Sequence, residues 1–163
     1  MKIKVILVPI DFSSTSLDAL ESAVDFAKSF KAGLTVLFVI EPIYYAVPDF
    51  VGAPAAMGSL IEEQIRTGRE QLLALQRRYA KRRVKLRTLM RTGTPYQEIV
   101  NTAKSLKADL VVMATHGRTG VTHLLLGSVA ERVVRSAHCP VLTLRGGKVP
   151  RRRSSVGKSK KRN

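Results

Sequence analysis

The sequence ADLVVMATHGRTGVTHLLLGS, at residues 108–128, carries the strongest structural signal in the chain. An apolar run that ends at Met113 leads into Gly117, and Gly127 and Ser128 follow after nine residues. Continuous apolar residues are typical of a strand covered on both faces. A glycine allows a tight turn after such a strand, and the second glycine lies where a helix begins. Because the first N–H groups of a helix have no partner within it, the pattern predicts an anion site and a phosphate-bearing ligand.

The rest of the chain alternates between strand-like and helical patterns. Mostly continuous apolar runs predict strands at residues 4–9, 34–40, 84–90, 109–113 and 141–144. Apolar residues at helical spacing lie between them, and each helical stretch except the second has a recognisable start signal. Ser13 or Ser14 caps the first helix, Thr94 with Pro95 starts the third, and Ser128 with Glu131 forms a capping box for the fourth.

This alternation predicts an α/β fold: a single open, mainly parallel five-stranded sheet with helices on both faces, Rossmann-like in outline. Ligands of such sheets bind at the carboxyl ends of the strands, beside the point where the strand order reverses. Asp11 and Gly117 fall at such strand ends. Residues 42–58 are predicted to form a long loop, which either covers the pocket or is a simple connection.

Length and composition indicate one domain at residues 1–145 and a basic tail at residues 146–163. The hydrophobic fraction of 45% suits a globular protein, and no apolar run approaches the roughly 18 residues of a membrane helix. We therefore expect a soluble protein with no transmembrane segment. Its single cysteine, Cys139, excludes an intrachain disulfide and fits the reducing cytoplasm.

The positive charge is shared between the domain and the tail. The chain has 28 Lys and Arg against 12 Asp and Glu, a formal net charge of +16. Eight of the basic residues and no acidic residue lie in the tail, so residues 1–145 keep a net charge of +8. One-signed charge with glycine and serine is typical of disorder. The tail either holds nucleic acid or anionic lipid without sequence preference, or is a solvated end with no partner.

Several landmarks in this order resemble the universal stress protein family. Its nucleotide-binding members carry a glycine, two residues, a glycine, nine residues, and then a glycine followed by serine or threonine. Gly117, the nine residues after it, Gly127 and Ser128 match this motif, whereas Ala114 stands in place of the first glycine. The sequences VPID at residues 8–11, RTGTP at 91–95 and HCPVL at 138–142 extend the resemblance over nearly the whole domain.

The resemblance implies an adenine nucleotide alpha hydrolase-like fold, ATP as ligand with Mg²⁺ as a possible companion, and a homodimer formed through Pro140 to Arg145. It implies that Asp11 and the backbone around Pro9 and Val39 face adenine and ribose, and that Gly117, Gly127, Ser128 and Val129 face the phosphates. The remaining cofactor-binding candidates are Ile10, Met113, Ala114 and Arg118. The methyl group of Ala114 is expected to narrow the approach of a ligand or to strain a positive φ angle.

Simpler roles remain open for the polar candidates. Ser128 contacts a phosphate or only caps its helix, and Asp11 contacts ribose or a metal or only caps the first helix. Arg118 and His123 meet phosphates or are solvated. His116, His123, His138 and Cys139 lack the spacing of a closed zinc site, and no Gly-x-Ser-x-Gly turn supports a hydrolase.

The sequence thus predicts an ATP-binding, nucleotide-responsive regulator of the stress response. No residue is assigned to catalysis or to a structural metal, and slow ATP hydrolysis through Asp11 and a bound metal is the most that the residues allow. The alternative is a dimeric scaffold of the same fold that binds no nucleotide and contacts a polyanion through its tail.

Overall fold

The computed structural model describes residues 2–41, 53–82, 84–115 and 127–145, and strands alternate with helices through these ranges. The elements are β1 (Val5–Ile10), α1 (Ser14–Phe30), β2 (Gly33–Ile40), α2 (Ala53–Tyr79), η1 (Ala80–Arg82), β3 (Leu86–Thr92), α3 (Pro95–Ser105), β4 (Leu110–Ala114), α4 (Ser128–Ser136) and β5 (Val141–Leu144). The predicted strands are confirmed, with ends that differ by two residues at most.

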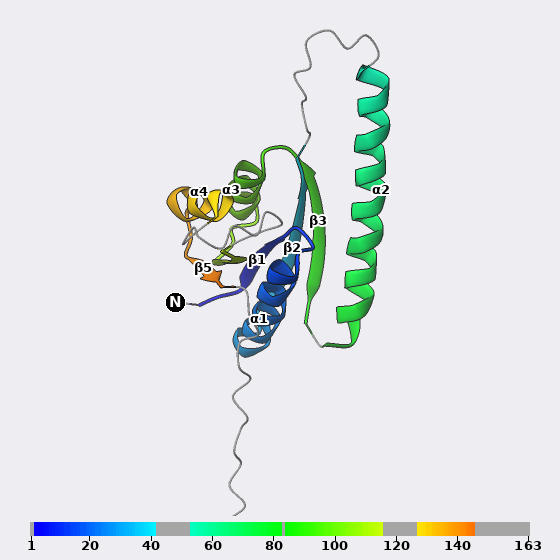
Figure 1. The fold of residues 1–163 in the computed structure, drawn as a ribbon. Coiled ribbons are helices and arrows are strands. Elements are labelled where there is room, and N and C mark those ends of the chain that lie inside the picture. The colour runs from blue at the N-terminus through cyan, green and yellow to red at the C-terminus, as the bar shows by residue number, and fades with distance from the viewer. Residues whose placement is uncertain (1, 42–52, 83, 116–126, 146–163) are drawn as a thin grey trace, which may run out of the picture.

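The strands form one sheet in the order β3-β2-β1-β4-β5, and every pair is parallel. The order reverses at β1, because β1 pairs with β2 on one side and with β4 on the other. Figure 1 shows the sheet between its helices, with α2 standing alongside β3. The predicted open parallel α/β fold is confirmed.

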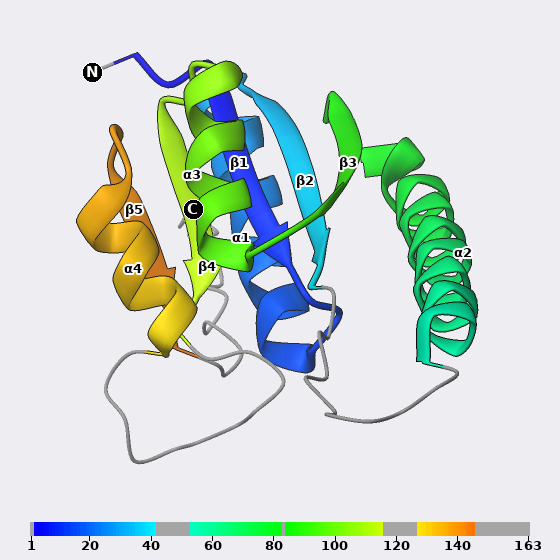
Figure 2. The ribbon, with the colours of Figure 1, turned by 90° about the horizontal axis from the view of Figure 1, so that it is seen from above.

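Helices cover both faces of the sheet. One apolar cluster lies between the sheet and helices α1 and α2, and a second lies between the sheet and helices α3 and α4. Figure 2 shows α3 and α4 on one side of the sheet and α1 on the other. Ile6 and Val8 of β1 point to the α1 and α2 side, where they pack with Leu20 and Leu72. Leu7, between them, points to the α3 and α4 side. The alternation explains the continuous apolar runs, since both faces of each central strand are buried.

The helix starts agree with the sequence prediction at α1 and differ at α4. Ser13 is the N-cap of α1, and its side chain accepts a hydrogen bond from the Ser16 N–H. Thr94 is the N-cap of α3 before Pro95, but it makes no side-chain cap bond. The predicted capping box of α4 is wrong, because Gly127 is the N-cap and its carbonyl accepts from the Glu131 N–H at 2.9 Å. The Glu131 carboxylate instead pairs with Arg135.

Helix α2 begins earlier than the sequence analysis placed it. The loop predicted for residues 42–58 is too long, since α2 already starts at Ala53. Pro54, treated as a loop residue, is the second residue of α2, where its fixed φ angle suits a first helical turn. Residues 42–52 lie outside the described ranges. None of the helices in the described ranges is long and apolar enough to cross a membrane.

Polar contacts tie the end of α2 to α1. The buried Tyr79 donates its hydroxyl to the Glu21 carboxylate at 2.7 Å, and Arg82 pairs with the same carboxylate at 3.1 Å. Burial, together with the hydrogen bond to Glu21, raises the pKa of Tyr79 well above its usual range. These contacts fix the lower end of α2 in Figure 1 against the rest of the domain.

Candidate functional site

The candidate site lies at the carboxyl edge of the sheet, where β1 and β4 are neighbours. Ile6 of β1 is in register with Leu110 of β4, so the two strands end side by side at Ile10 and Ala114. The next residues, Asp11 and Thr115, therefore leave the sheet at the reversal of strand order. In open α/β sheets this is the position at which ligands bind.

Asp11 closes a polar turn between β1 and α1. Its Oδ1 accepts hydrogen bonds from the Ser13 N–H at 3.0 Å and from the Ser13 hydroxyl, and its N–H donates to the Ser16 hydroxyl at 3.3 Å. The carboxylate therefore supports the cap of α1, as the simpler interpretation of Asp11 expected. Asp11 remains half-exposed at the edge of the sheet, so the cap does not exclude a ligand contact.

Phe12 occupies a conformation that aromatic residues rarely adopt. Its φ angle is +64°, in the left-handed region. Its ring packs edge-on against Phe38 of β2, with ring centroids 5.0 Å apart at an angle of 63°. This contact on the α1 and α2 side holds the Asp11 turn in place, and residues in such strained conformations concentrate at functional sites.

A second turn at the same edge joins β4 to α4. The Thr115 N–H donates to the Leu144 carbonyl at 2.9 Å, and the Thr115 carbonyl accepts from the Gly127 N–H at 2.7 Å. Thr115 is buried. The start of α4 is thereby held directly at the end of β4, as the motif predicted.

Within the described ranges, no side chain caps the start of α4. Its N-cap is Gly127, which has no side chain to accept from the first turn. Ser128 is the first helical residue and is exposed, whereas Val129 packs against the apolar cluster beneath α3 and α4. The N–H groups of this turn thus add a partial positive charge to the carboxyl edge.

Ala114 fits its position without strain. It is the last residue of β4, pairs with Leu144 and is buried. The positive-φ residues in the described part of the chain are Phe12, Lys31, Lys107 and Gly93, so Ala114 adopts an ordinary strand conformation. The prediction of backbone strain at Ala114 is therefore wrong. Compared with the glycine of the motif, Ala114 adds only a methyl group at this position.

The apolar candidate residues line the carboxyl edge of the sheet, and the polar groups they can present to a ligand are those of the backbone. Pro9, Ile10 and Met113 are buried, and Val39 is half-buried on β2. Val39 and Met113 belong to the α3 and α4 side of the sheet, and Ile10 to the opposite side. Gly117 and Arg118, like His116 and His123, lie outside the described residues.

His138 and Cys139, the remaining residues considered as metal ligands, lie at the amino edge of the sheet, where the strands begin. Cys139 packs against the apolar cluster beneath α3 and α4, and burial, with a smaller effect of the Asp109 charge, raises the pKa of its thiol. Such a thiol is a poor nucleophile at neutral pH. Over the described ranges, no three His, Cys, Asp or Glu side chains gather as metal ligands. Two surface hollows lie away from the carboxyl edge, one on α2 and one beside Cys139.

Sequence reasoning missed two residues of the carboxyl edge. Phe12 was not considered, because a positive φ angle at an aromatic residue leaves no trace in a sequence. Thr115 entered only as part of the motif, although its carbonyl holds the start of α4. The cluster of Ser13, Thr15 and Ser16 directly after Asp11 was the available signal for a hydrogen-bonded turn.

The sheet order, the two polar turns and the helix start at Gly127 define a doubly wound α/β protein with an anion-compatible carboxyl edge. The family model described as universal stress protein family matches residues 2–145, and the chain belongs to this family. Universal stress protein MJ0531 of Methanocaldococcus jannaschii is 42% identical over 144 residues, which cover 87% of this chain and 82% of that protein.

Solved structures agree with this assignment. The universal stress protein UspA from Lactobacillus plantarum superimposes with a TM-score of 0.78 at 25% identity, covering 89% of this chain and 99% of that one. Two more distant structures share the fold with a TM-score of 0.62 each. One is a universal stress protein in complex with cAMP, 22% identical, covering 90% of this chain and 100% of that one. The other is the universal stress protein from Archaeoglobus fulgidus in complex with dAMP. It is 21% identical, and the match covers 88% of this chain and 98% of that one.

Proposed function

We propose that this chain binds an adenine nucleotide, ATP with Mg²⁺, at the carboxyl edge between β1 and β4, and that the bound nucleotide regulates its part in the stress response. The observation that carries the proposal is the first turn of α4, which begins after the N-cap Gly127 and is held beside the end of β4 by the Gly127 to Thr115 hydrogen bond. The cAMP and dAMP complexes of proteins with this fold support an adenine nucleotide as the ligand class.

Each part of the nucleotide has a matching group at this edge. The N–H groups of Ser128 and Val129 suit phosphate oxygens, since both the free donors and the helix dipole favour an anion. In this proposal Asp11, which is half-exposed, accepts from ribose or contacts Mg²⁺. The backbone around Pro9 and Val39 forms the adenine side. Gly117 and Arg118 complete the proposed site from the sequence motif.

The first experiment is to denature freshly purified protein and identify any released nucleotide by mass spectrometry, followed by calorimetric titration with ATP and Mg²⁺. Released or titratable ATP would establish the site with Ala114 as a tolerated change. Failure in both formats would instead favour the scaffold of the same fold that binds no nucleotide.

Gly127→Val tests the position of the site. The backbone angles of Gly127, φ −67° and ψ 151°, are open to valine, so the substitution adds a branched side chain beside the proposed phosphates without forcing the backbone. The loss of a favourable N-cap residue is expected to cost about 1 kcal/mol. Ala137→Val is the matched control, because Ala137 ends the same helix with φ −69° and ψ 141°. We expect at least a tenfold loss of ATP affinity for Gly127→Val only; equal affinities would place the phosphates elsewhere.

We propose further that the protein is a homodimer formed through Pro140 to Arg145 and acts in the cytoplasm. β5 lies at the edge of the sheet, and its four residues are half-buried. The carbonyls of Pro140 and Leu144 accept from β4, so by alternation the N–H groups of Val141 and Thr143 point away from it. Pairing protects such an edge from aggregation. Thr143→Pro removes one outward donor and is expected to shift the dimer toward monomer in sedimentation experiments.

A further inference from the structure

The amino edge of the sheet, opposite the proposed nucleotide site, carries a row of lysines. From β3 to β4 in sheet order, each strand is preceded by one: Lys85 before β3, Lys31 before β2, Lys4 before β1 and Lys107 before β4. All four side chains are exposed. We call these four residues the lysine row. With neighbouring strands about 4.8 Å apart, the row spans about 15 Å.

Hydrogen bonds between the strand starts hold the row in line. The Leu34 N–H donates to the Lys85 carbonyl at 2.9 Å, and the Gly33 N–H donates to the Lys4 carbonyl at 2.8 Å. The Asp109 N–H donates to the Val5 carbonyl at 2.9 Å, which fixes the start of β4 beside that of β1. The four lysines thus come from distant parts of the sequence and meet at one edge.

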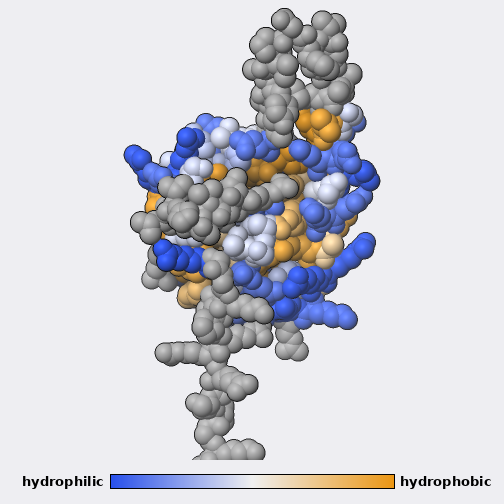
Figure 3. Space-filling view, in the orientation of Figure 1, coloured by the Kyte–Doolittle hydropathy of each residue, from blue (hydrophilic) through white to orange (hydrophobic). Residues whose placement is uncertain are grey.

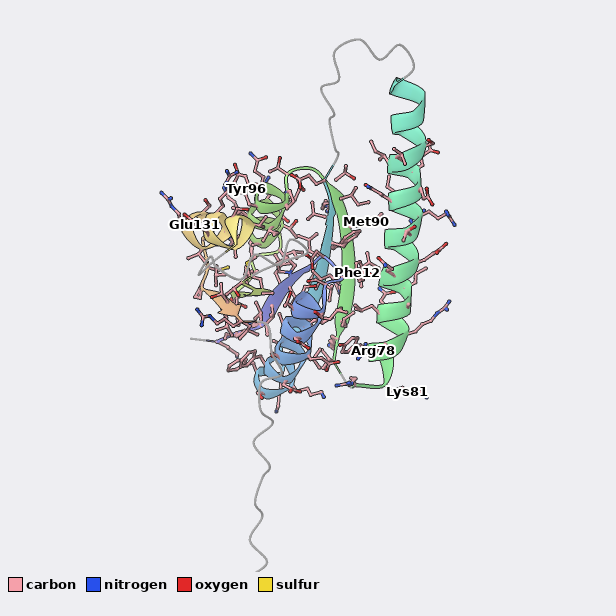
Figure 4. The ribbon with its side chains drawn as sticks, in the orientation of Figure 1. Phe12, Arg78, Lys81, Met90, Tyr96 and Glu131 are labelled. Carbon is pink, nitrogen blue, oxygen red and sulfur yellow. The ribbon has the colours of Figure 1, made fainter. Side chains whose placement is uncertain are left out.

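Helix ends add further positive charge to the same edge. In a parallel α/β fold, the helices end where the strands begin. The last turns of α1, α2 and α3 carry Lys28, Arg77 with Arg78, and Lys104. Figure 4 shows Arg78 and Lys81 where α2 turns back toward β3, and Figure 3 shows strongly hydrophilic residues projecting from this lower part of the molecule.

Two of the acidic groups near the row, Asp109 and Glu21, have hydrogen-bond partners. The Asp109 carboxylate accepts from the N–H groups of Lys4 and Val5 at 2.7 and 2.9 Å. The Glu21 carboxylate is shared by Arg78, Arg82 and the Tyr79 hydroxyl. Neither acid forms a salt bridge with the lysine row, although the charge of Lys4 helps to lower the pKa of Asp109. The four lysines outnumber Asp109, so the edge keeps a positive net charge.

Two lysines of the row stand where the backbone favours another residue. Lys31 and Lys107 follow the ends of α1 and α3 with φ angles of +55° and +50°. Glycine or asparagine is the usual residue in this left-handed position, because a Cβ atom is unfavourable there. Backbone conformation does not favour lysine at these positions, whereas its positive charge suits both the carbonyls of the helix end and an anion bound at this edge.

An exposed aromatic ring and a shallow hollow adjoin the row. Phe30, the last residue of α1, is 47% exposed directly before Lys31, and its ring stacks against Phe26. At the β4 end of the row, a hollow of about 360 Å³ is lined by Lys104, Lys107 and His138, together with Asp109 and Cys139. Cationic groups beside an accessible aromatic face are typical of surfaces that bind single-stranded nucleic acid.

We propose that the amino edge binds single-stranded nucleic acid: the lysine row contacts the phosphate backbone and Phe30 stacks on a base. The interaction has no sequence preference, because no group of the row is positioned by the fold to read base edges. It uses the folded domain and requires neither the tail nor a nucleotide at the carboxyl edge.

The test measures binding of the full chain to a fluorescent 20-nucleotide oligo(dT) by anisotropy over a range of salt concentrations. The edge variant combines Lys4→Gln, Lys31→Gly, Lys85→Gln and Lys107→Gly. Its two glycines relieve the left-handed positions, so it is expected to fold at least as stably as the parent. The control variant loses the same charge at exposed residues away from the row: Arg66→Gln, Arg69→Gln, Arg91→Gln at the carboxyl end of β3, and Arg132→Gln.

If all four lysines contact phosphates, each loss removes about 0.7 from the slope of log affinity against log salt. At 0.15 M salt this is about fourfold for each contact, so the edge variant would bind up to about 200-fold more weakly, with a slope smaller by about 3. The control variant is expected to change affinity less than fivefold. Phe30→Ala is expected to weaken binding of the single strand and leave duplex binding unchanged.

The tail is a competing source of oligonucleotide binding, so both variants are also compared in a full chain whose eight tail cations are replaced by glutamine. There, too, the edge variant must lose at least ten times more affinity than the control variant. Equal losses in the two variants would overturn the proposal. It would also be overturned if the edge variant lost binding to phosphatidylserine-containing vesicles but kept its affinity for the oligonucleotide, since the edge would then be a membrane surface.

Discussion

Gly68→Ala tests how closely α2 packs on the sheet. Gly68 is a buried residue in the middle of α2, and a Cβ atom added there would lie 2.6 Å from Cε1 and 3.0 Å from Cδ1 of Phe38. It would also lie 3.4 Å from the sulfur of Met90, which Figure 4 shows beside α2. Carbon atoms in good contact are about 3.5–4.0 Å apart, so α2 must move away from β2 by about 1 Å.

Two effects of opposite sign decide the result. Alanine in place of glycine stabilises a helix interior by about 1 kcal/mol. Overpacking a well-packed core costs about 1–3 kcal/mol, and Phe38 cannot easily yield because its other side is packed against Phe12. The net expectation is a loss of about 1 kcal/mol in the free energy of unfolding.

Gly58→Ala is the control, since Gly58 lies in the same helix and a Cβ atom there meets nothing within 4 Å. It should gain up to about 1 kcal/mol, which separates the two variants by about 2 kcal/mol and their melting temperatures by about 6 °C. Urea unfolding and thermal melts measure both quantities. If Gly68→Ala is as stable as Gly58→Ala, α2 does not pack on Phe38 as the structure has it.

Two further predictions concern pH. The pKa of Tyr79 is raised in the folded state by burial and by the Glu21 carboxylate, so its contribution to stability is present at neutral pH and is lost as pH rises above about 10. Tyr79→Phe should cost about 1 kcal/mol in urea unfolding at pH 7 and should flatten the alkaline limb of the stability profile. The pKa of Asp109 is lowered by the N–H groups of Lys4 and Val5, so its contribution is present above the ordinary value of 3.8 and is lost as pH falls through the folded value. Asp109→Asn should flatten the acid limb of the same profile; unchanged limbs would contradict these assignments.

The sequence was sufficient to predict β1, β2 and β4, because burial on both faces makes each of them a continuous apolar run. β5 was predicted at residues 141–144, as found, since Pro140 marks its start and an apolar run follows. The N-cap of α4 was misplaced by one residue: Ser128 and Glu131 satisfy the capping-box pattern, but Gly127 is the N-cap and Ser128 is the first helical residue. A local pattern cannot distinguish these alternatives when both residues suit a helix start.

The residues of the proposed phosphate side lie in a contiguous sequence motif, whereas the lysines of the amino edge come from distant parts of the chain. The Gly127 and Ser128 motif follows β4 closely along the chain, so the proposed phosphate side could be predicted from the sequence alone. The lysine row was not found, because Lys4, Lys31, Lys85 and Lys107 belong to no common motif and meet only through the strand register. The available signal was that each lysine lies within three residues of a predicted strand start.

The geometry of a parallel sheet separates the two proposed anion surfaces and makes their independence testable. Helix starts face the carboxyl edge, where their N–H groups attract phosphates, and helix ends face the amino edge, where their carbonyls attract cations. The cations at the amino edge extend beyond helix ends to Lys4 and Lys85, so helix dipoles alone do not explain them. A nucleotide and an oligonucleotide would then occupy opposite ends of rigid strands. Saturating ATP with Mg²⁺ should therefore leave the oligo(dT) affinity of the tail-neutralised chain unchanged within twofold, whereas direct competition would mean that both anions use the same edge.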